Sequence, residues 1–268
     1  MRATSSYLIA ASTVYCYKFS RVMDTATAEN ERAPASPLPF DIARAFTFFF
    51  EDPDWIPKLA VGTLFAFLSP FLIGAILVCG YTVALARRVR EDRAPRLPEW
   101  DDVQELFLDG LRGMAVTLAH KLPLLLLGVL VLLALAGGIY LGREAEEFMF
   151  LGLPALFGGF VVVFVLAVAV VVYLPAVMVR LIQTDRVVST FDVMANVDFI
   201  RQHLSAYALG LLTIVLALLV SQLGFFVFCI GIFPAAFWAT CVMGYVVGDL
   251  AKLEPGRPGG REAEPAAP

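Results

Sequence analysis

A short acidic stretch near the middle of the sequence has the residue types needed for acid–base or cation-binding chemistry. Residues 93–113 read RAPRLPEWDDVQELFLDGLRG and contain five acids: Glu99, Asp101, Asp102, Glu105 and Asp109. Paired carboxylates such as Asp101 and Asp102 can bind a cation or exchange protons, but such sites need convergent partners, commonly a histidine. The two histidines of the chain, His120 and His203, lie well outside the stretch. The acids alone therefore do not define a catalytic site.

The same acids have a structural explanation at the start of a helix. An extended arm ends at Pro98, and acids that open the following helix stabilise the positive end of its dipole. Asp109 and Arg112 are three residues apart, a spacing that allows an ion pair along a helix. We therefore favour a structural role for Asp101 and Asp102 over a catalytic one.

The composition indicates a membrane protein. Hydrophobic residues make up 59% of the chain and charged residues 16%, against roughly 45–50% and about 25% in soluble domains. The excess lies in long apolar runs, and runs of about 18 or more apolar residues predict transmembrane helices. The prediction is an all-α, polytopic helical membrane bundle of about five spans with interfacial amphipathic helices. The helical transmembrane domain is expected over residues 40–253.

Five apolar runs define the expected spans, at residues 59–86, 122–141, 148–179, 204–223 and 225–250. Pro70 lies near the middle of the first run, where a kink is expected. The third run is longer than a bilayer core of roughly 30 Å requires, so a break is expected near Pro154 or residues 158–159. The last two runs have almost no loop between them and predict an antiparallel hairpin.

The distribution of lysine and arginine predicts the orientation. Basic residues follow the first, third and fifth runs, whereas the short loop GREAEE between the second and third carries one arginine and three glutamates. The positive-inside rule then places the C-terminus in the cytoplasm and GREAEE outside. Five spans would place the N-terminal region outside, whereas a re-entrant hairpin at Pro70 would place it inside. Both alternatives stay open.

The two ends of the chain are expected to be disordered, over residues 1–39 and 254–268. Residues 24–39 are rich in alanine, proline and glutamate, a composition typical of disorder. Residues 1–22 do not resemble a signal peptide, because Lys18 and Arg21 follow the weak apolar patch instead of preceding it. We hypothesise that translation starts at Met23.

Three segments, at residues 39–50, 103–114 and 190–204, have the spacing of amphipathic helices. Their expected apolar faces are, in order, Ile42, Ala43, Phe46, Phe49 and Phe50; Val103, Leu106, Phe107, Leu111 and Met114; and Val193, Met194, Val197, Ile200 and Leu204. Thr190 is the expected N-cap of the third helix. Each segment adjoins a span, so we expect these helices to lie in the headgroup layer, although docking on a partner is an alternative.

Several side chains are expected at the membrane surface. Trp55 and Trp100 suit the headgroup level, and Lys58 can extend its ammonium toward the headgroups. The arginine run of residues 87–96, which includes Arg87 and Arg88, is either a topology signal or a binding site for anionic headgroups.

Small residues at fourfold spacing mark expected packing faces. One stripe comprises Gly62, Ala66, Pro70 and Gly74, and the other Ala236, Thr240, Gly244 and Gly248. They are expected to pack within one molecule, against neighbouring helices or against each other; a homo-oligomer is the less favoured alternative. Pro70 and Pro234 are each followed ten residues later by Gly-Tyr, which suggests a parallel repeat or chance similarity.

No metal or cofactor site is expected. The four cysteines form no CxxC pair and no cluster with histidine, and they are expected to act as small apolar packing residues. The expected spans 59–86 and 122–141 contain no charged residue, whereas ion-coupled carriers usually have ionisable groups within the membrane.

Several motifs together resemble one membrane-protein family. FTFFFEDPDWIPKLAVGTL contains Trp55 and Lys58, GYTVALARRV contains Gly80, Tyr81, Arg87 and Arg88, and LPEWDDVQELFLDGLRG contains Pro98, Trp100, Asp101 and Asp102. With STFDVMANVDFIRQHLSAYALGLL and MGYVVGDLAKL, they resemble the bacterial and archaeal family called domain of unknown function 4013. The family more often has glutamine at the position of Asp249. The resemblance, over residues 40–253, implies a helical fold in a prokaryotic plasma membrane and brings no catalytic residues.

The leading functional hypothesis is a non-enzymatic scaffold or accessory membrane subunit with a membrane-protein partner or a second copy as its contact. It rests on the lack of charged chemistry within the spans beside well-formed amphipathic segments. The alternative is a permease or channel for an apolar or lipid-like molecule. An interfacial enzyme using Asp101 or Asp102 is least favoured. No cofactor and no nucleic-acid partner are expected.

Overall fold

The computed structural model describes residues 40–91, 96–141, 146–226 and 231–253. Every regular element in these ranges is a helix, which confirms the all-α class. The predictions for residues 1–39, including the start at Met23, and for residues 254–268 lie outside the described residues.

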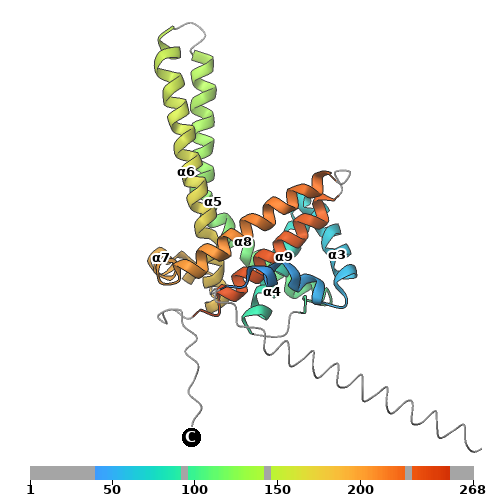
Figure 1. The fold of residues 1–268 in the computed structure, drawn as a ribbon. Coiled ribbons are helices and arrows are strands. Elements are labelled where there is room, and N and C mark those ends of the chain that lie inside the picture. The colour runs from blue at the N-terminus through green and yellow to red at the C-terminus, as the bar shows by residue number, and fades with distance from the viewer. Residues whose placement is uncertain (1–39, 92–95, 142–145, 227–230, 254–268) are drawn as a thin grey trace, which may run out of the picture. The chain divides into compact units, whose positions relative to one another are not determined.

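The helices follow one another along the chain (Figure 1). Their bounds are α2 Ile42–Thr47, η1 Phe48–Glu51, α3 Trp55–Phe67, η2 Ser69–Phe71, α4 Ile73–Arg90, α5 Val103–Leu141, α6 Glu146–Thr184, η3 Val188–Phe191, α7 Val193–Gln202, α8 Leu204–Leu223, η4 Gly224–Phe226 and α9 Ile232–Leu250. Among the described residues, four helical stretches are long and apolar enough to cross a membrane: Val103–Ala134, Phe157–Thr184, Leu204–Phe226 and Ile232–Leu250.

The first expected span, residues 59–86, is two helices and not one. The chain leaves the α-helical path at Ser69–Phe71, and Leu72 has a positive φ of 61°. Proline at position 70 favours this break, because it lacks an N–H group and restricts the residue before it. A Cβ added to Gly74 would lie 2.2 Å from the Phe65 carbonyl oxygen, so α4 starts directly against the end of α3. Residues 59–86 therefore form a helical hairpin.

The other expected spans differ mainly in their ends. α5 joins the expected amphipathic helix and the second span into one helix of 39 residues with Pro123 inside it. α6 is also continuous, so the break expected near Pro154 or residues 158–159 does not occur. α8 has the predicted bounds, and α9 packs against it as the second helix of a hairpin but begins later than predicted, at Ile232.

α4 and α9 lie side by side and run in the same direction. A Cβ on Gly244 would lie 2.9 Å from the Thr82 carbonyl oxygen, and one on Gly248 would lie 2.5 Å from that of Ala86. The residue numbers of these contacting positions increase in the same direction along both helices, so α4 and α9 are parallel. Gly244 and Gly248 of the second stripe thus pack within the molecule against α4, and Gly62 of the first stripe lies on the Phe237 ring of α9.

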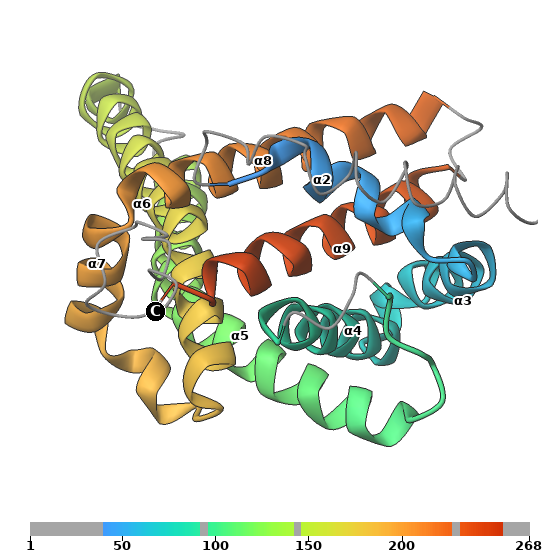
Figure 2. The same cartoon turned by 60° about the horizontal axis from the view of Figure 1, so that its bottom comes forward.

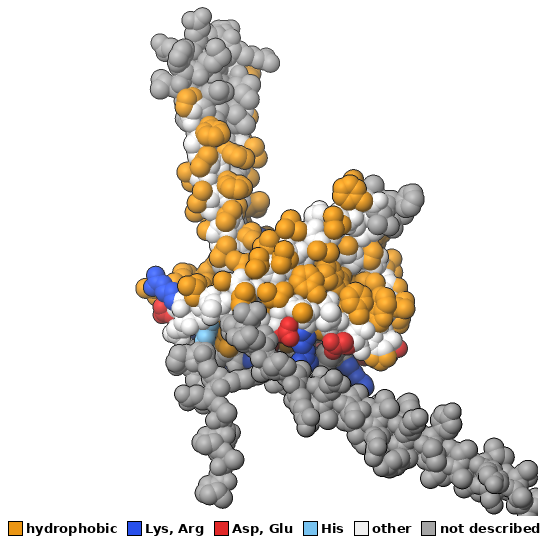
Figure 3. Space-filling view, in the orientation of Figure 1, with side chains coloured by type: hydrophobic (Ala, Val, Ile, Leu, Met, Phe, Trp, Pro, Cys, Tyr) orange, Lys and Arg blue, Asp and Glu red, His pale blue; other side chains and the backbone are white. Residues whose placement is uncertain are grey.

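The C-terminal ends of α4, α6 and α9 meet at one end of the bundle, which we call the base. Arg90 on α4 donates to the Ile182 carbonyl oxygen on α6 at 2.6 Å, and Gln183 donates to the Leu253 carbonyl oxygen beyond α9 at 2.9 Å. Figure 3 shows charged side chains gathered along the base, with hydrophobic side chains covering the helices above it. The α5–α6 hairpin rises from the base beyond the tips of the α3–α4 and α8–α9 hairpins (Figure 1).

The first predicted amphipathic segment packs against the helical bundle through most of its expected apolar face. Figure 2 shows α2 lying across α8 and α9. Of the five expected apolar residues, Ile42, Phe46 and Phe49 contact the core, whereas Ala43 and Phe50 are exposed. Phe40, Ala45 and Phe48 are buried as well, and the chain tightens into the 3-10 turn η1 after Thr47, where the spacing of buried residues departs from that of an α-helix.

The other two amphipathic segments leave part of their predicted apolar faces on the surface. At the start of α5, the expected apolar residues Val103, Phe107 and Leu111 are exposed, whereas Leu106 and Asp109 are buried on the side facing α4. In the α7 segment, the N-cap is Asp192, which accepts from the Ala195 N–H, and the expected cap Thr190 is buried within η3. Met194 and Leu204 are exposed as expected, and Asn196 and Phe199 face the bundle.

Candidate functional site

Four residues from two distant segments form an ionic group at the base, here called the Lys58 cluster, in which Asp52, Lys58 and Leu97 are buried and Glu99 is exposed. The Lys58 ammonium lies 3.0 Å from Asp52 Oδ2, 2.7 Å from Glu99 Oε1 and 3.1 Å from the Leu97 carbonyl oxygen. The Leu97 N–H in turn donates to Asp52 Oδ2 at 2.7 Å. All three N–H donors of the ammonium therefore have acceptors, and the cluster joins the start of α3 to the arm before α5.

Lys58 does not extend toward headgroups, contrary to the sequence-based expectation. It is only 4% exposed, because the turn that precedes α3 places Asp52 beside it. The Asp54 N–H donates to Asp52 Oδ1 at 2.8 Å, which fixes the carboxylate within the turn EDPDW. Burial raises the pKa of the Asp52 carboxyl, but the N–H groups of Asp54 and Leu97 and the Lys58 ammonium stabilise the charged form, so the pKa lies below its ordinary value.

Aromatic rings pack directly over the Lys58 cluster. Trp100 stacks on Tyr81 with ring centroids 4.5 Å apart and planes at 21°, and its indole N–H donates to the Lys58 carbonyl oxygen at 3.3 Å. The Tyr81 hydroxyl donates to the buried Pro98 carbonyl oxygen at 3.1 Å. Phe237 on α9 lies against the same two rings. Trp100 is thus a half-buried link between the start of α3, α4 and α9.

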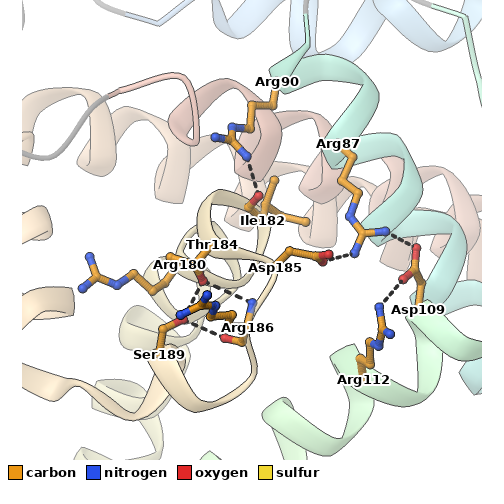
Figure 4. Close-up of polar contacts among 10 residues, drawn as sticks. All are labelled: Arg87, Arg90, Asp109, Arg112, Arg180, Ile182, Thr184, Asp185, Arg186 and Ser189. Atoms are coloured by element: carbon orange, nitrogen blue, oxygen red, sulfur yellow. Dashed lines mark hydrogen bonds and ion pairs between the residues drawn. The ribbon is translucent and has the colours of Figure 1, made fainter.

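A second group of ion pairs at the base is centred on Arg87 (Figure 4). Its guanidinium pairs with Asp109 on α5 and lies 2.6 Å from Asp185, which follows α6. Asp185 has a positive φ of 53° and its N–H donates to the Leu181 carbonyl oxygen, so it closes the last turn of α6. Arg87 therefore ties α4 to both helices of the long hairpin. The expected pair of Asp109 with Arg112 is present at 3.7 Å.

The backbones of α4 and α5 touch where Gly80 meets Gly110. A Cβ added to Gly80 would lie 1.8 Å from the Leu106 carbonyl oxygen, and one on Gly110 would lie 1.9 Å from that of Ile76. A side chain at either position would force the two helices apart. Gly80 is required by this close approach, and its neighbour Tyr81 is thereby brought over Trp100.

The remaining predicted site residues take separate positions. Trp55 is half-buried, with its ring centroid 5.3 Å from that of Phe50. Arg88 donates to the Leu97 carbonyl oxygen at 3.4 Å, next to the Lys58 cluster. Asp102 accepts the Glu105 N–H at 2.9 Å and so caps the start of α5, whereas Asp101 is exposed.

Sequence reasoning did not single out Asp52, Leu97 and Asp185, and it predicted only Arg112 as a partner of Asp109. The contribution of Leu97 comes from its backbone, which leaves no signature in the residue type. A signal for Asp52 was available, because an acid within the aromatic stretch FFFEDPDW needs a nearby cation when it is buried.

The fold and these contacts define the class: a helical membrane protein whose polar motif residues hold its helices together. The family model described as Protein of unknown function (DUF4013) matches residues 63–237, and the chain belongs to this family. No curated protein and no solved structure matches the chain.

Proposed function

We propose that this protein is a non-enzymatic scaffold or accessory subunit of a prokaryotic plasma membrane. The proposal rests on the observation that the side chains of the family motifs make contacts within the protein itself. Lys58, Tyr81, Arg87 and Trp100 contact other segments of the same chain, through Leu97, Pro98, Asp109 and Tyr81 respectively. Residues engaged in this way fix the arrangement of the helices and so support a rigid structural role.

We further propose that the base and the C-terminus lie in the cytoplasm. The basic side chains of Arg87, Arg90 and Lys252 belong to helix ends at the base, and the positive-inside rule favours the cytoplasm for such an end. The hairpin α3–α4 returns the chain to the same end, which favours an N-terminal region on the cytoplasmic side. This is the re-entrant alternative that the sequence left open.

Close packing supports the scaffold over the permease or channel. Within the described residues, α4 approaches α5 at Gly80 and α9 at Gly248 so closely that an added methyl group would overlap backbone atoms. A passage for an apolar molecule between these helices would need them to separate. Anionic headgroups remain a proposed partner of the arginine run, and we assign that contact to the exposed Arg96, because Arg87 and Arg90 are engaged within the molecule.

Affinity purification from native membranes in several mild detergents, followed by mass spectrometry, tests the proposal. We expect one reproducible membrane-protein partner, or a second copy of the chain. Recovery of the protein as a lone monomer under every condition would contradict the scaffold.

A matched pair of variants locates the contact. Charge reversal of exposed residues at the start of α5, with Asp101→Lys and Glu105→Lys, is expected to lower recovery of the partner, because both side chains face solvent at the base. Gly128→Ala, at a position with nothing within 4 Å of the added methyl group, is expected to leave recovery unchanged. Full recovery with the charge-reversed variant would show that the partner binds elsewhere.

A further inference from the structure

We propose that the α3–α4 and α8–α9 hairpins are re-entrant, so that they enter the bilayer from the base and end within it, while α5–α6 crosses to the other side. We further propose that this unequal occupancy of the two leaflets makes the protein favour, and stabilise, membrane that bulges toward the base side. The proposed partner of the two hairpins is the hydrocarbon of the leaflet on the base side. The inference goes beyond the scaffold and needs only a helical protein inserted in the membrane.

The length of α3 gives the first argument. α3 has 13 residues, which at about 1.5 Å per residue spans roughly 20 Å, whereas the hydrocarbon core is roughly 30 Å thick. Lys58 in its first turn is fixed at the base by the Lys58 cluster. The other end of α3, at Phe67, therefore stops inside the core.

The tip of α8–α9 lies beside the tip of α3–α4. The rings of Phe67 on α3 and Phe233 at the start of α9 are 5.1 Å apart. Across the α8–α9 tip, a Cβ on Gly224 would lie 2.4 Å from the Gly231 carbonyl oxygen, so the chain doubles back tightly there. The depth that α3 can reach thus sets the depth of both tips, although α8 and α9 are each long enough to cross when upright. Figure 1 shows both tips well short of the tip of α5–α6.

The residues at the two tips suit hydrocarbon and not water. At the α3–α4 tip, Phe71 is 71% exposed and Leu72 is 66% exposed; at the other tip, Phe226 is 83% exposed. No charged residue occurs between Arg201 and Asp249 in the sequence. The sequence of the α5–α6 connection is GREAEE, which suits the aqueous phase.

Backbone hydrogen bonding makes the α3–α4 turn compatible with a low-dielectric surrounding. A turn in hydrocarbon must satisfy its own N–H and carbonyl groups. The Phe71 N–H donates to Leu68 O at 3.0 Å, the Leu72 N–H donates to Ser69 O at 3.1 Å, and the Ser69 hydroxyl donates to Phe65 O at 3.2 Å. Pro70 has no N–H to satisfy. This turn therefore carries fewer unpaired polar groups than an open loop.

Leaflet asymmetry follows from these depths. The leaflet on the base side accommodates the larger part of α3, α4, α8 and α9 together with the lower part of α5–α6, whereas the opposite leaflet accommodates the tips of the two shorter hairpins and the upper part of α5–α6. Protein inserted into one leaflet enlarges its area relative to the other, and such insertion responds to membrane curvature. The molecule would therefore concentrate where the leaflet on its base side is convex.

Cysteine accessibility tests the re-entrant tips in the full-length protein in cells. Single cysteines replace Phe226 at a tip, Asp54 at the base and Ala145 in the GREAEE loop, in a chain whose four native cysteines are serine. With a membrane-impermeant maleimide, we expect Asp54→Cys to label from one side, Ala145→Cys from the other, and Phe226→Cys from neither. Labelling of Phe226→Cys from the same side as Ala145→Cys, and at a similar rate, would overturn the proposal.

Reconstitution tests the curvature effect with the unaltered protein. Full-length protein is inserted into small and large vesicles of the same phosphatidylcholine and phosphatidylglycerol mixture, with its orientation determined by protease access to the base. We expect molecules whose base faces outward to be enriched on small vesicles by roughly twofold or more. Equal density on both sizes would overturn the curvature effect even with re-entrant tips. Neither result depends on a protein partner, so failure of the scaffold proposal is separately detectable.

Discussion

Lys58 donates a hydrogen bond to the carbonyl oxygen of Leu97 at 3.1 Å, although the two residues are 39 positions apart. The N–H of the same Leu97 donates to Asp52, which also pairs with Lys58. Both backbone groups of Leu97, its carbonyl oxygen and its N–H, therefore bind the arm before α5 to the start of α3. This relationship explains how a strongly apolar chain keeps a lysine and an aspartate buried together.

Replacing Lys58 with methionine is expected to destabilise the fold by about 3–5 kcal/mol, because it leaves the buried Asp52 carboxylate without its cation. Thermal unfolding of the detergent-purified protein measures the change. Arg112→Met is the control, since the Arg112 side chain is 55% exposed and its pair with Asp109 should contribute about 1 kcal/mol or less. Equal effects of the two variants would argue against the Lys58 cluster as a stabilising group.

Acid is expected to remove the contribution of Asp52. Its pKa in the folded state lies below the ordinary value of 3.8, so the charged form stabilises the fold fully above that value. The contribution is lost as the pH falls through the lower, folded-state pKa. The difference in unfolding temperature between the wild type and Asp52→Asn should therefore be constant near neutral pH and narrow in strong acid. A difference in unfolding temperature that grows in acid would show that the pKa of Asp52 is raised in the folded state and not lowered.

Gly110→Ala is expected to separate α4 from α5, because the added methyl group would lie 1.9 Å from the Ile76 carbonyl oxygen. Overpacking of this kind costs about 1–3 kcal/mol or more. Gly128→Ala, on the same helix but in open space, should stabilise α5 by up to about 1 kcal/mol. Unfolding temperatures of the two variants should move in opposite directions, and similar shifts would contradict the close crossing.

The two ion pairs of Arg87, with Asp109 and with Asp185, are expected to contribute unequally to the stability of the fold. The Asp109 side chain is 5% exposed and that of Asp185 is 65% exposed, so water weakens the second pair much more. Asp109→Asn should lower the unfolding temperature clearly, whereas Asp185→Asn should change stability by about 1 kcal/mol or less. Spin-label distances between the C-terminal end of α4 and the start of α5 should broaden for Asp109→Asn, because this variant removes the tie between those two helices. The opposite order would place the main tie at the end of α6.

Periodicity and composition predicted the helical class and the bounds of α8, because a long apolar run with polar residues before it leaves little choice. They did not distinguish a kinked span from a hairpin at Pro70. Proline occurs in both, and the number of apolar residues is the same for both. The decisive features are the positive φ of Leu72 and the contact of Gly74 with the end of α3, which depend on how the two helices pack.

The sequence motifs identified several residues of the candidate site, but they did not predict which residues these side chains contact. Trp100 and Lys58 were expected at the membrane surface, since aromatic and basic residues near apolar runs usually lie there. Their burial depends on Tyr81, Asp52 and the Leu97 backbone, which lie in other segments of the chain. No local pattern contains that information.

The sequence by itself determined that this is a helical membrane protein, because long apolar runs can satisfy their backbone groups in a bilayer only by forming helices. It also marked the polar motifs that distinguish the family. Only the tertiary structure decided that those motifs meet at one base and that the run around Pro70 turns back. The physical reason is that buried ion pairs and close backbone crossings join residues far apart in the chain, and their partners exist only once the helices have packed.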